Sequence, residues 1–108
     1  DEKYLDMATA INGSGPAYFF LFLEALIDAG VHIGLSRPVA EELVFQTALG
    51  SILMASESGK HLAELKNMVT SPGGTTAAAL FELEDGRLRA VVDRAVRAAY
   101  ERSKALGK

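Results

Sequence analysis

The sequence predicts an all-α fold, a helical bundle of six helices joined by short breaks. Nearly every segment places apolar side chains three and four residues apart, which is the spacing of one face of an α-helix. Glycine, proline and serine stand between these segments, and these residues commonly start or stop helices. No stretch alternates apolar and polar residues like a half-buried strand. Short connections of this kind are typical of helix bundles.

The first helix is predicted from four apolar positions, namely Tyr4, Met7, Ala8 and Ile11. The run at residues 12–16 is expected to interrupt it, because Pro16 suits the first position of a new helix. A long apolar helix then covers residues 17–33 and is expected to end at Gly34.

Four further helices follow, at residues 36–57, 62–69, 76–83 and 87–106. Gly50 lies in the middle of the third predicted helix, where glycine costs about 1 kcal/mol relative to alanine. We therefore expect another helix to approach closely at Gly50. The fifth helix is expected to end near Gly86.

Length, charge and cysteine content limit the function classes. A chain of 108 residues is expected to form one domain with one modest core. The formal net charge of −3 gives no electrostatic attraction to nucleic acid or to an anionic membrane, so we expect neither partner. The absence of cysteine excludes disulfides, thiolate metal sites and a cysteine nucleophile. No signal peptide is evident, and we expect a cytoplasmic location.

The helix at residues 17–33 predicts association with a second copy of the chain. Its only polar side chains form one narrow stripe, Glu24, Asp28 and His32. A helix that is apolar on all other sides is buried on most of them, and a chain this small has few helices to cover it. Membrane insertion is the competing explanation, but the uninterrupted apolar run covers only residues 17–23, well short of about 20 residues. The two carboxylates that follow would also be costly in lipid.

The same stripe leaves two interpretations open. Spacings of four residues place Glu24, Asp28 and His32 side by side, as metal ligands would be. The stripe could equally be solvated, with His32 stabilised by the helix C-terminus and by Asp28. No further ligand cluster accompanies it, and we expect no metal.

Residues 70–76, Thr-Ser-Pro-Gly-Gly-Thr-Thr, predict a small anion site. The glycines allow a tight turn and close approach to a ligand. The unpaired N–H groups and the positive dipole end of the following helix attract a phosphate or carboxylate. Three hydroxyls flank this start, on Ser71, Thr75 and Thr76. The alternative is ordinary helix initiation with Thr75 as N-cap, and the run is not a P-loop.

Other catalytic arrangements are missing from the sequence. No Gly-x-Gly-x-x-Gly follows a strand, so this chain is not expected to bind a dinucleotide in the usual manner. No serine–histidine–aspartate arrangement can be argued from spacing. The tyrosines are interpreted as packing residues, namely Tyr4, Tyr18 and Tyr100.

Residues 65–80, with their Gly-Gly-x-Thr core, resemble a characteristic motif of pyrroline-5-carboxylate reductases. Residues 13–18, Gly-Ser-Gly-Pro-Ala-Tyr, are a second match, and further similarity lies at residues 24–31 and 34–37. The resemblance covers essentially the whole chain and corresponds to the C-terminal part of that family. Asn12 departs from the serine that often stands there, and the family's N-terminal nicotinamide-binding domain is absent from this chain.

The resemblance implies a reductase that converts 1-pyrroline-5-carboxylate into L-proline with NADPH or NADH, the last step of proline biosynthesis. It implies that residues 1–108 are the dimerisation and substrate-binding domain, which forms an interlocked homodimer and, through dimers, larger rings. The substrate, a cyclic imino acid, is expected at the dimer interface beside a nicotinamide held by the other domain. The isolated chain is expected to be inactive, and the alternative is a non-catalytic all-α dimerisation module.

The resemblance also implies the site residues. Thr76 is the expected catalytic residue, with its hydroxyl facing the ring nitrogen of the imine. The substrate carboxylate is expected on Ser71 and on the backbone N–H groups near Thr76. The expected substrate-binding set is Ser71, Gly73, Gly74, Thr75, Thr76, Gly13, Ser14, Gly15 and Pro16. The last four are expected to shape the opposite wall.

Overall fold

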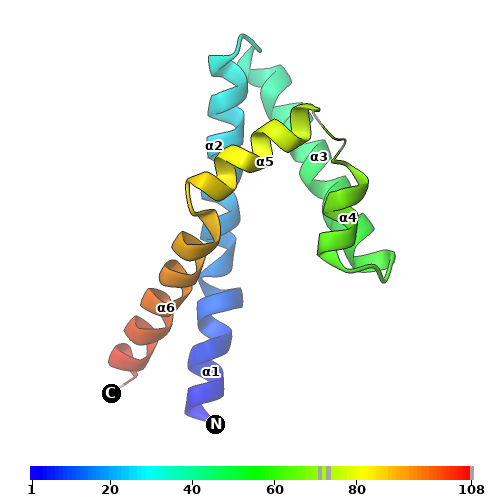
Figure 1. The fold of residues 1–108 in the computed structure, drawn as a ribbon. Coiled ribbons are helices and arrows are strands. Elements are labelled where there is room, and N and C mark those ends of the chain that lie inside the picture. The colour runs from blue at the N-terminus through cyan, green and yellow to red at the C-terminus, as the bar shows by residue number, and fades with distance from the viewer. Residues whose placement is uncertain (71, 73, 108) are drawn as a thin grey trace. The chain divides into compact units, whose positions relative to one another are not determined.

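A computed structural model describes residues 1–70, 72 and 74–107 of the chain. Over these residues it contains six α-helices, one π-helix and no strand, which confirms the predicted all-α class. In chain order the elements are α1 (Glu2–Ala8), η1 (Thr9–Gly13), α2 (Gly15–His32), α3 (Arg37–Glu57), α4 (Leu62–Met68), α5 (Thr75–Asp85) and α6 (Leu88–Leu106) (Figure 1).

The prediction that residues 12–16 interrupt the helix is wrong in form. The chain keeps a helical path there, through the π-helix η1 and Ser14 into α2. Ser14 alone separates η1 from α2, and it has right-handed helical angles of φ −86° and ψ −22°. The Ser14 N–H donates to the Thr9 carbonyl, five residues back, at 2.8 Å, and the Ala17 N–H donates to Ser14 at 3.1 Å. In a regular helix the ring of Pro16 would collide with a carbonyl of the preceding turn. The wider turn accommodates the ring.

Helix α2 ends at His32, and the predicted stop signal Gly34 lies in the turn that follows. Gly34 has a φ of +120°, which side-chain-bearing residues rarely adopt. The Leu35 N–H donates to the Gly30 carbonyl at 3.0 Å, and the Gly34 N–H donates to the Val31 carbonyl at 3.0 Å. These two bonds form a Schellman motif, which satisfies the last carbonyls of the helix.

Replacing Gly34 with alanine is expected to lower the free energy of unfolding by about 1–2 kcal/mol, because a Cβ is strained at a positive φ. Urea unfolding at fixed protein concentration measures this loss. Gly107→Ala is the matched control, because Gly107 has right-handed angles of φ −78° and ψ −2°. Its effect is expected to stay within about 0.5 kcal/mol. Equal losses in the two variants would contradict the assignment.

Helix α5 also ends close to the predicted position, at Asp85. The residue in the left-handed conformation is Arg87, with a φ of 62°, and not Gly86. The Gly86 N–H still bonds back into the helix, to the Glu82 carbonyl at 2.9 Å. The left-handed residue that ends the helix therefore lies at Arg87, one residue after the expected end near Gly86.

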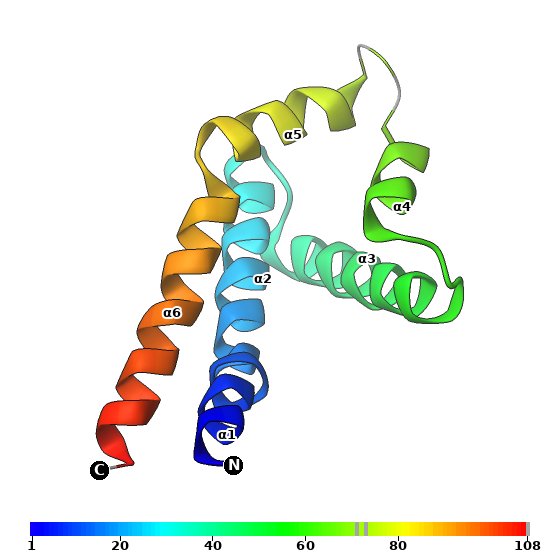
Figure 2. The same cartoon turned by 60° about the horizontal axis from the view of Figure 1, so that its bottom comes forward.

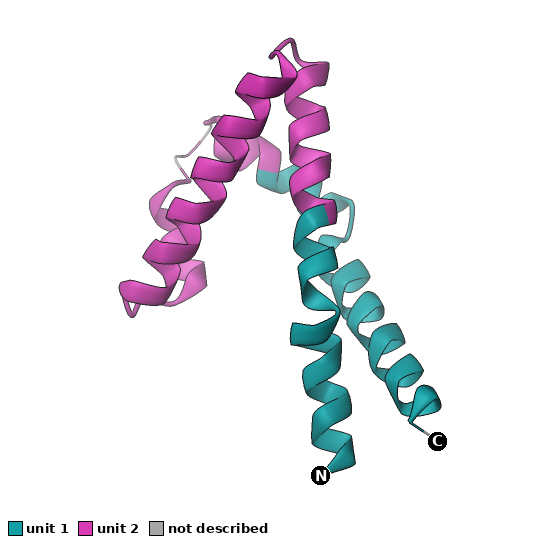
Figure 3. Ribbon diagram, turned by 180° about the vertical axis from the view of Figure 1, so that it is seen from behind, with its two compact units in different colours: residues 1–20, 80–108 teal, residues 21–79 magenta. Residues whose placement is uncertain are grey.

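The described chain divides into two compact units, shown in Figure 3. The first unit contains residues 1–20 and 80–108, and the second contains residues 21–79. The boundaries fall within α2 and within α5.

In the first unit, α6 packs alongside α1 and η1 (Figures 1 and 2). The Ser103 hydroxyl donates to the Asp6 carboxylate at 2.7 Å, and this bond joins residues 97 positions apart in the sequence. Ala10 of η1 is 1% exposed. The small alanine side chain allows the π turn to lie close to its neighbours.

In the second unit, the beginning of α3 lies against the end of α2. A Cβ built at Gly30 would come within 3.2 Å of the Ala40 Cβ, so a glycine fits this approach best. Ile27 and Ala40 are both buried. The Arg37 guanidinium donates to the Asp28 carboxylate at 3.0 Å, on the outer side of the same turn.

A single copy of the chain has little core. Among the hydrophobic residues that the structure describes, only Ala10, Ile27 and Ala40 are buried. Large apolar side chains of α2 are exposed, with Phe20 and Leu21 each at 67%. The expected modest core is therefore not found within one copy, because the apolar residues of α2 and α3 cover more than one face of each helix. Exposed apolar surface of this extent marks an interaction site.

One stretch of the described residues also meets a simple membrane-span criterion. Consecutive helical residues Glu2–His32 are long enough, with a mean hydropathy of 1.3, and 17% of the most apolar window is buried. The core helix of a soluble protein passes the same test, so a single such stretch is weak evidence.

Candidate functional site

The expected anion site lies at the start of α5, in the second unit. Gly74 precedes the helix, and Thr75 and Thr76 are its first two residues. Gly74 and Thr76 are half-buried, while Thr75 is exposed. Ser71 and Gly73, which belong to the same expected set, lie outside the described residues.

Gly74 occupies the N-cap position of α5. Its carbonyl accepts the first intrahelical bond, from the Ala78 N–H at 3.2 Å. This corrects the alternative that placed Thr75 at the N-cap. The N–H groups of Thr75 and Thr76 come before any possible intrahelical acceptor, so they have no partner within the helix.

The charges around this helix start suit an anion. The first turn of α5 contains no acidic residue, so the helix itself places no carboxylate at the positive end of its dipole. Just upstream, the Thr70 hydroxyl donates to the Lys66 carbonyl at 2.6 Å and so belongs to the end of α4. That the hydroxyl and N–H groups of Thr76 contact the substrate stays a prediction.

The second expected group lies at the junction of η1 and α2, in the first unit. It consists of Gly13, Ser14, Gly15 and Pro16, of which Gly15 is buried and Ser14 half-buried. A Cβ at Gly13 would come within 3.3 Å of the Thr9 methyl carbon, which is tight. The two expected groups belong to different units, so their proximity stays a prediction.

Sequence reasoning missed the contribution of Tyr18 to this junction. The Tyr18 hydroxyl donates to the Ala10 carbonyl at 2.7 Å, across the π turn. Tyr18 had been interpreted as a packing residue only. The partner lies eight residues earlier, and no simple spacing rule connects the two positions.

The polar stripe on α2 has the features of a solvated surface. Glu24, Asp28 and His32 are all exposed, and Asp28 is paired with Arg37. Within the described ranges, no three acidic, histidine or cysteine residues are arranged to hold a metal ion.

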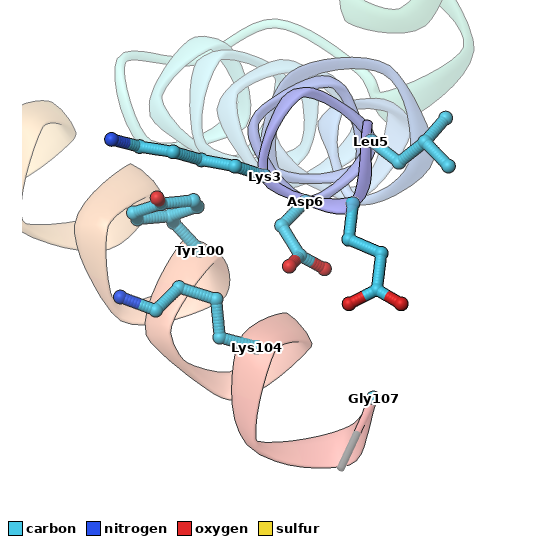
Figure 4. Close-up of a pocket in the computed structure, with 7 residues that line it drawn as sticks. Lys3, Leu5, Asp6, Tyr100, Lys104 and Gly107 are labelled. Atoms are coloured by element: carbon cyan, nitrogen blue, oxygen red, sulfur yellow. The ribbon is translucent and has the colours of Figure 1, made fainter.

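A hollow of about 590 Å³ lies in the first unit, between α1 and α6. Figure 4 shows Lys3 and Asp6 on one side and Tyr100 and Lys104 on the other. The Lys104 ammonium lies 4.8 Å from the centroid of the Tyr100 ring. None of the described residues of the expected substrate-binding set lines this hollow.

A family model described as pyrroline-5-carboxylate reductase dimerisation matches residues 2–106. The chain belongs to this family. The match confirms the resemblance of the two motifs, at residues 13–18 and 65–80, and covers nearly the whole all-α fold.

Individual pyrroline-5-carboxylate reductases are also similar in sequence to this chain. The pyrroline-5-carboxylate reductase of Arabidopsis thaliana is 54% identical over 106 residues, which cover 98% of this chain and 38% of that protein. The reductase of Mycobacterium leprae is 52% identical over 122 residues, covering 97% of this chain and 42% of that protein. The chain therefore spans about two fifths of the length of these relatives.

Solved structures of the same family share the fold. The crystal structure of Plasmodium falciparum pyrroline carboxylate reductase with NADP bound is 50% identical, with a TM-score of 0.96. The match covers 100% of this chain and 41% of that one. The reductase of Coxiella burnetii gives a TM-score of 0.96 at 44% identity, covering 100% and 40% of the two chains.

Proposed function

We propose that residues 1–108 are the dimerisation and substrate-binding domain of a reductase that converts 1-pyrroline-5-carboxylate into L-proline with NADPH or NADH. The observation that carries the proposal is the family match over residues 2–106, with the Gly-Gly-x-Thr core intact at the start of α5. The nicotinamide-binding part of the enzyme lies outside this chain. We place the protein in the cytoplasm, with neither nucleic acid nor membrane as a partner.

The substrate carboxylate binds at the start of α5 in this proposal. It accepts hydrogen bonds from the Ser71 hydroxyl and from the N–H groups of Gly74, Thr75 and Thr76. Several N–H groups together with a helix dipole can hold a carboxylate without lysine or arginine. Two features support this placement: the first N–H groups of α5 have no acceptor within the helix, and its first turn contains no acidic residue. Gly73 gives the loop its close approach to the ligand.

The Thr76 hydroxyl faces the ring nitrogen of the imine in the bound substrate, and residues 13–16 form the opposite wall. Thr76 holds the imine in one orientation, which lowers the entropic part of the barrier, and the wall contributes to binding of the substrate. The nicotinamide, when bound to the rest of the enzyme, supplies the hydride. The described part of this chain contains no strand, and therefore lacks the strand, glycine-rich turn and helix that bind dinucleotides.

We further propose that two copies of this chain interlock as a homodimer, and that dimers join into rings. The exposed apolar side chains support this arrangement, because Phe19, Phe20 and Leu21 in succession remain uncovered in one copy. Burying such side chains gains about 1.5–3 kcal/mol each. A second copy of the chain exposes the same apolar side chains, so each copy can cover those of the other.

Sedimentation of the purified chain is expected to show dimers or larger species at micromolar concentration, because a lone copy leaves its apolar helices uncovered. Analytical ultracentrifugation over a dilution series makes the measurement, and circular dichroism verifies that the sample is folded. A well-folded single subunit at these concentrations would contradict the shared interface.

Activity tests the enzymatic part of the proposal. A full-length protein that contains this chain is expected to oxidise NADPH or NADH when 1-pyrroline-5-carboxylate is added, followed by nicotinamide absorbance. The chain alone is expected to dimerise and to catalyse nothing. A full-length protein that dimerises without reducing the imine would favour a non-catalytic dimerisation module instead.

A further inference from the structure

The Tyr18 hydroxyl makes a hydrogen bond across the irregular part of the helical path. Its donation to the Ala10 carbonyl, at 2.7 Å, is of ordinary length for an O–H···O bond. Tyr18 stands on α2 after Pro16, and Ala10 stands in η1 before it. The bond therefore joins the two sides of the π turn, while Tyr18 itself is half-buried.

The π turn needs such a bond more than a regular helix would. A π turn is a rare form that occurs mostly as a short insertion within α-helices, often at functional sites. Pro16 brings no N–H, so the junction has one backbone donor fewer. Ala10 is 1% exposed, so water has little access to replace the hydroxyl if it is removed.

The other side of η1 is already fixed. Helix α6 packs against η1, and the Ser103–Asp6 bond ties α6 to α1. The Tyr18–Ala10 hydrogen bond acts on the remaining part of the junction, which is the segment between these two residues. That segment contains Gly13, Ser14, Gly15 and Pro16.

We infer that Tyr18 is a positioning residue for the substrate. It acts through the Ala10 carbonyl and keeps residues 13–16 in the shape of a substrate wall, without touching the reacting atoms. This inference rests on the proposed function, which assigns those residues to the wall. Because Tyr18 acts on the shape of the site, its loss is expected to change the KM for the imine more than kcat.

The test is Tyr18→Phe in the full-length reductase, with Tyr100→Phe as the matched control. Tyr100 is also half-buried in the first unit, and its ring contacts Lys104 away from the junction. For Tyr18→Phe, we expect a KM raised about 3- to 10-fold, the effect of one lost hydrogen bond, with kcat changed less than about 2-fold. Tyr100→Phe is expected to leave both constants at their parent values.

Hydrogen–deuterium exchange provides a second readout that does not depend on activity. Peptides covering residues 9–17 are expected to exchange about 3- to 10-fold faster in Tyr18→Phe, because the junction opens more often. Peptides from α3 serve as the internal reference. Unchanged exchange at residues 9–17 would overturn the inference, and so would faster exchange with an unchanged KM.

Failure of the proposed function would look different from failure of this inference. A parent enzyme that reduces no imine would end the proposed function, and with it the substrate role of Tyr18. An active parent enzyme in which Tyr18→Phe behaves like Tyr100→Phe would end the inference alone.

Discussion

Thr76→Val is expected to lower kcat/KM for 1-pyrroline-5-carboxylate by about 10- to 100-fold in the full-length reductase. Valine keeps the shape of threonine and removes only the hydroxyl. A hydrogen bond of this kind is worth roughly 1.5–3 kcal/mol in the transition state, which corresponds to that range of rates. Thr76 is half-buried and belongs to the first turn of α5, at the end of the helix where the backbone N–H groups have no acceptor within the helix. Steady-state kinetics with varied imine concentration makes the measurement.

Two companion variants distinguish an effect of the lost Thr76 hydroxyl from an effect on the fold. Thr76→Ser keeps a hydroxyl and is expected to retain most of the activity. Thr47→Val makes the same chemical change at an exposed position of α3 and is expected to have no effect on kcat/KM. Parent-like kinetics in Thr76→Val would remove Thr76 from the mechanism.

Gly50→Ala is expected to weaken self-association by about 5- to 150-fold, the equivalent of roughly 1–3 kcal/mol of overpacking at a close helix contact. A Cβ at Gly50 would meet nothing within 4 Å in the described part of one copy. Within the described part of the second unit, no helix therefore makes the expected close approach to Gly50. Leu49 and Ile52 beside it are 54% and 56% exposed, so the surrounding surface is apolar and uncovered.

The direction of the Gly50→Ala effect decides whether Gly50 faces water or packs against a second copy of the chain. In a helix that faces water, alanine is more favourable than glycine by about 0.8–1 kcal/mol, so the variant would be more stable. In a helix packed closely against a second copy, the added methyl group collides and the dimer dissociates more readily. Dilution series in the ultracentrifuge measure the change, with Ser51→Ala as the control at the adjacent position. Tighter or unchanged association would place Gly50 in solvent.

The helices and most of their ends were predictable, because their signals are local. Ser36 precedes α3, and its side chain accepts the Val39 N–H at 3.4 Å, as the opening position implied. Gly34 and Gly59 have positive φ angles where the preceding helices end. Each signal involves residues within one or two turns of the chain, and sequence patterns describe such neighbours well.

The π turn and its hydrogen bond were not predictable from local patterns. Proline and glycine at residues 12–16 ordinarily indicate a break. Here packing against α6 and the bond from Tyr18 to Ala10 keep the path helical. Both depend on partners that lie beyond the local window. Similarly, the left-handed conformation falls on Arg87 although a glycine precedes it.

The candidate site was predictable only in part. The free N–H groups at the start of α5 follow from helix geometry, and the glycines before it indicate a ligand loop. The role of Thr76 came from the family resemblance, since no spacing argument singles out one hydroxyl among three. The wall at residues 13–16 has no local chemical signal of its own, and two glycines with a proline are common in turns.

The first unit consists of the two ends of the sequence, residues 1–20 and 80–108, with residues 21–79 between them. During translation, α1 and η1 therefore leave the ribosome well before α6, the helix against which they pack. Until α6 emerges, α1 and η1 lack the helix against which they pack, and contacts this distant in sequence form slowly. Between the synthesis of η1 and that of α6, the nascent polypeptide thus exposes the apolar segments of this unit, and such exposed surface favours aggregation.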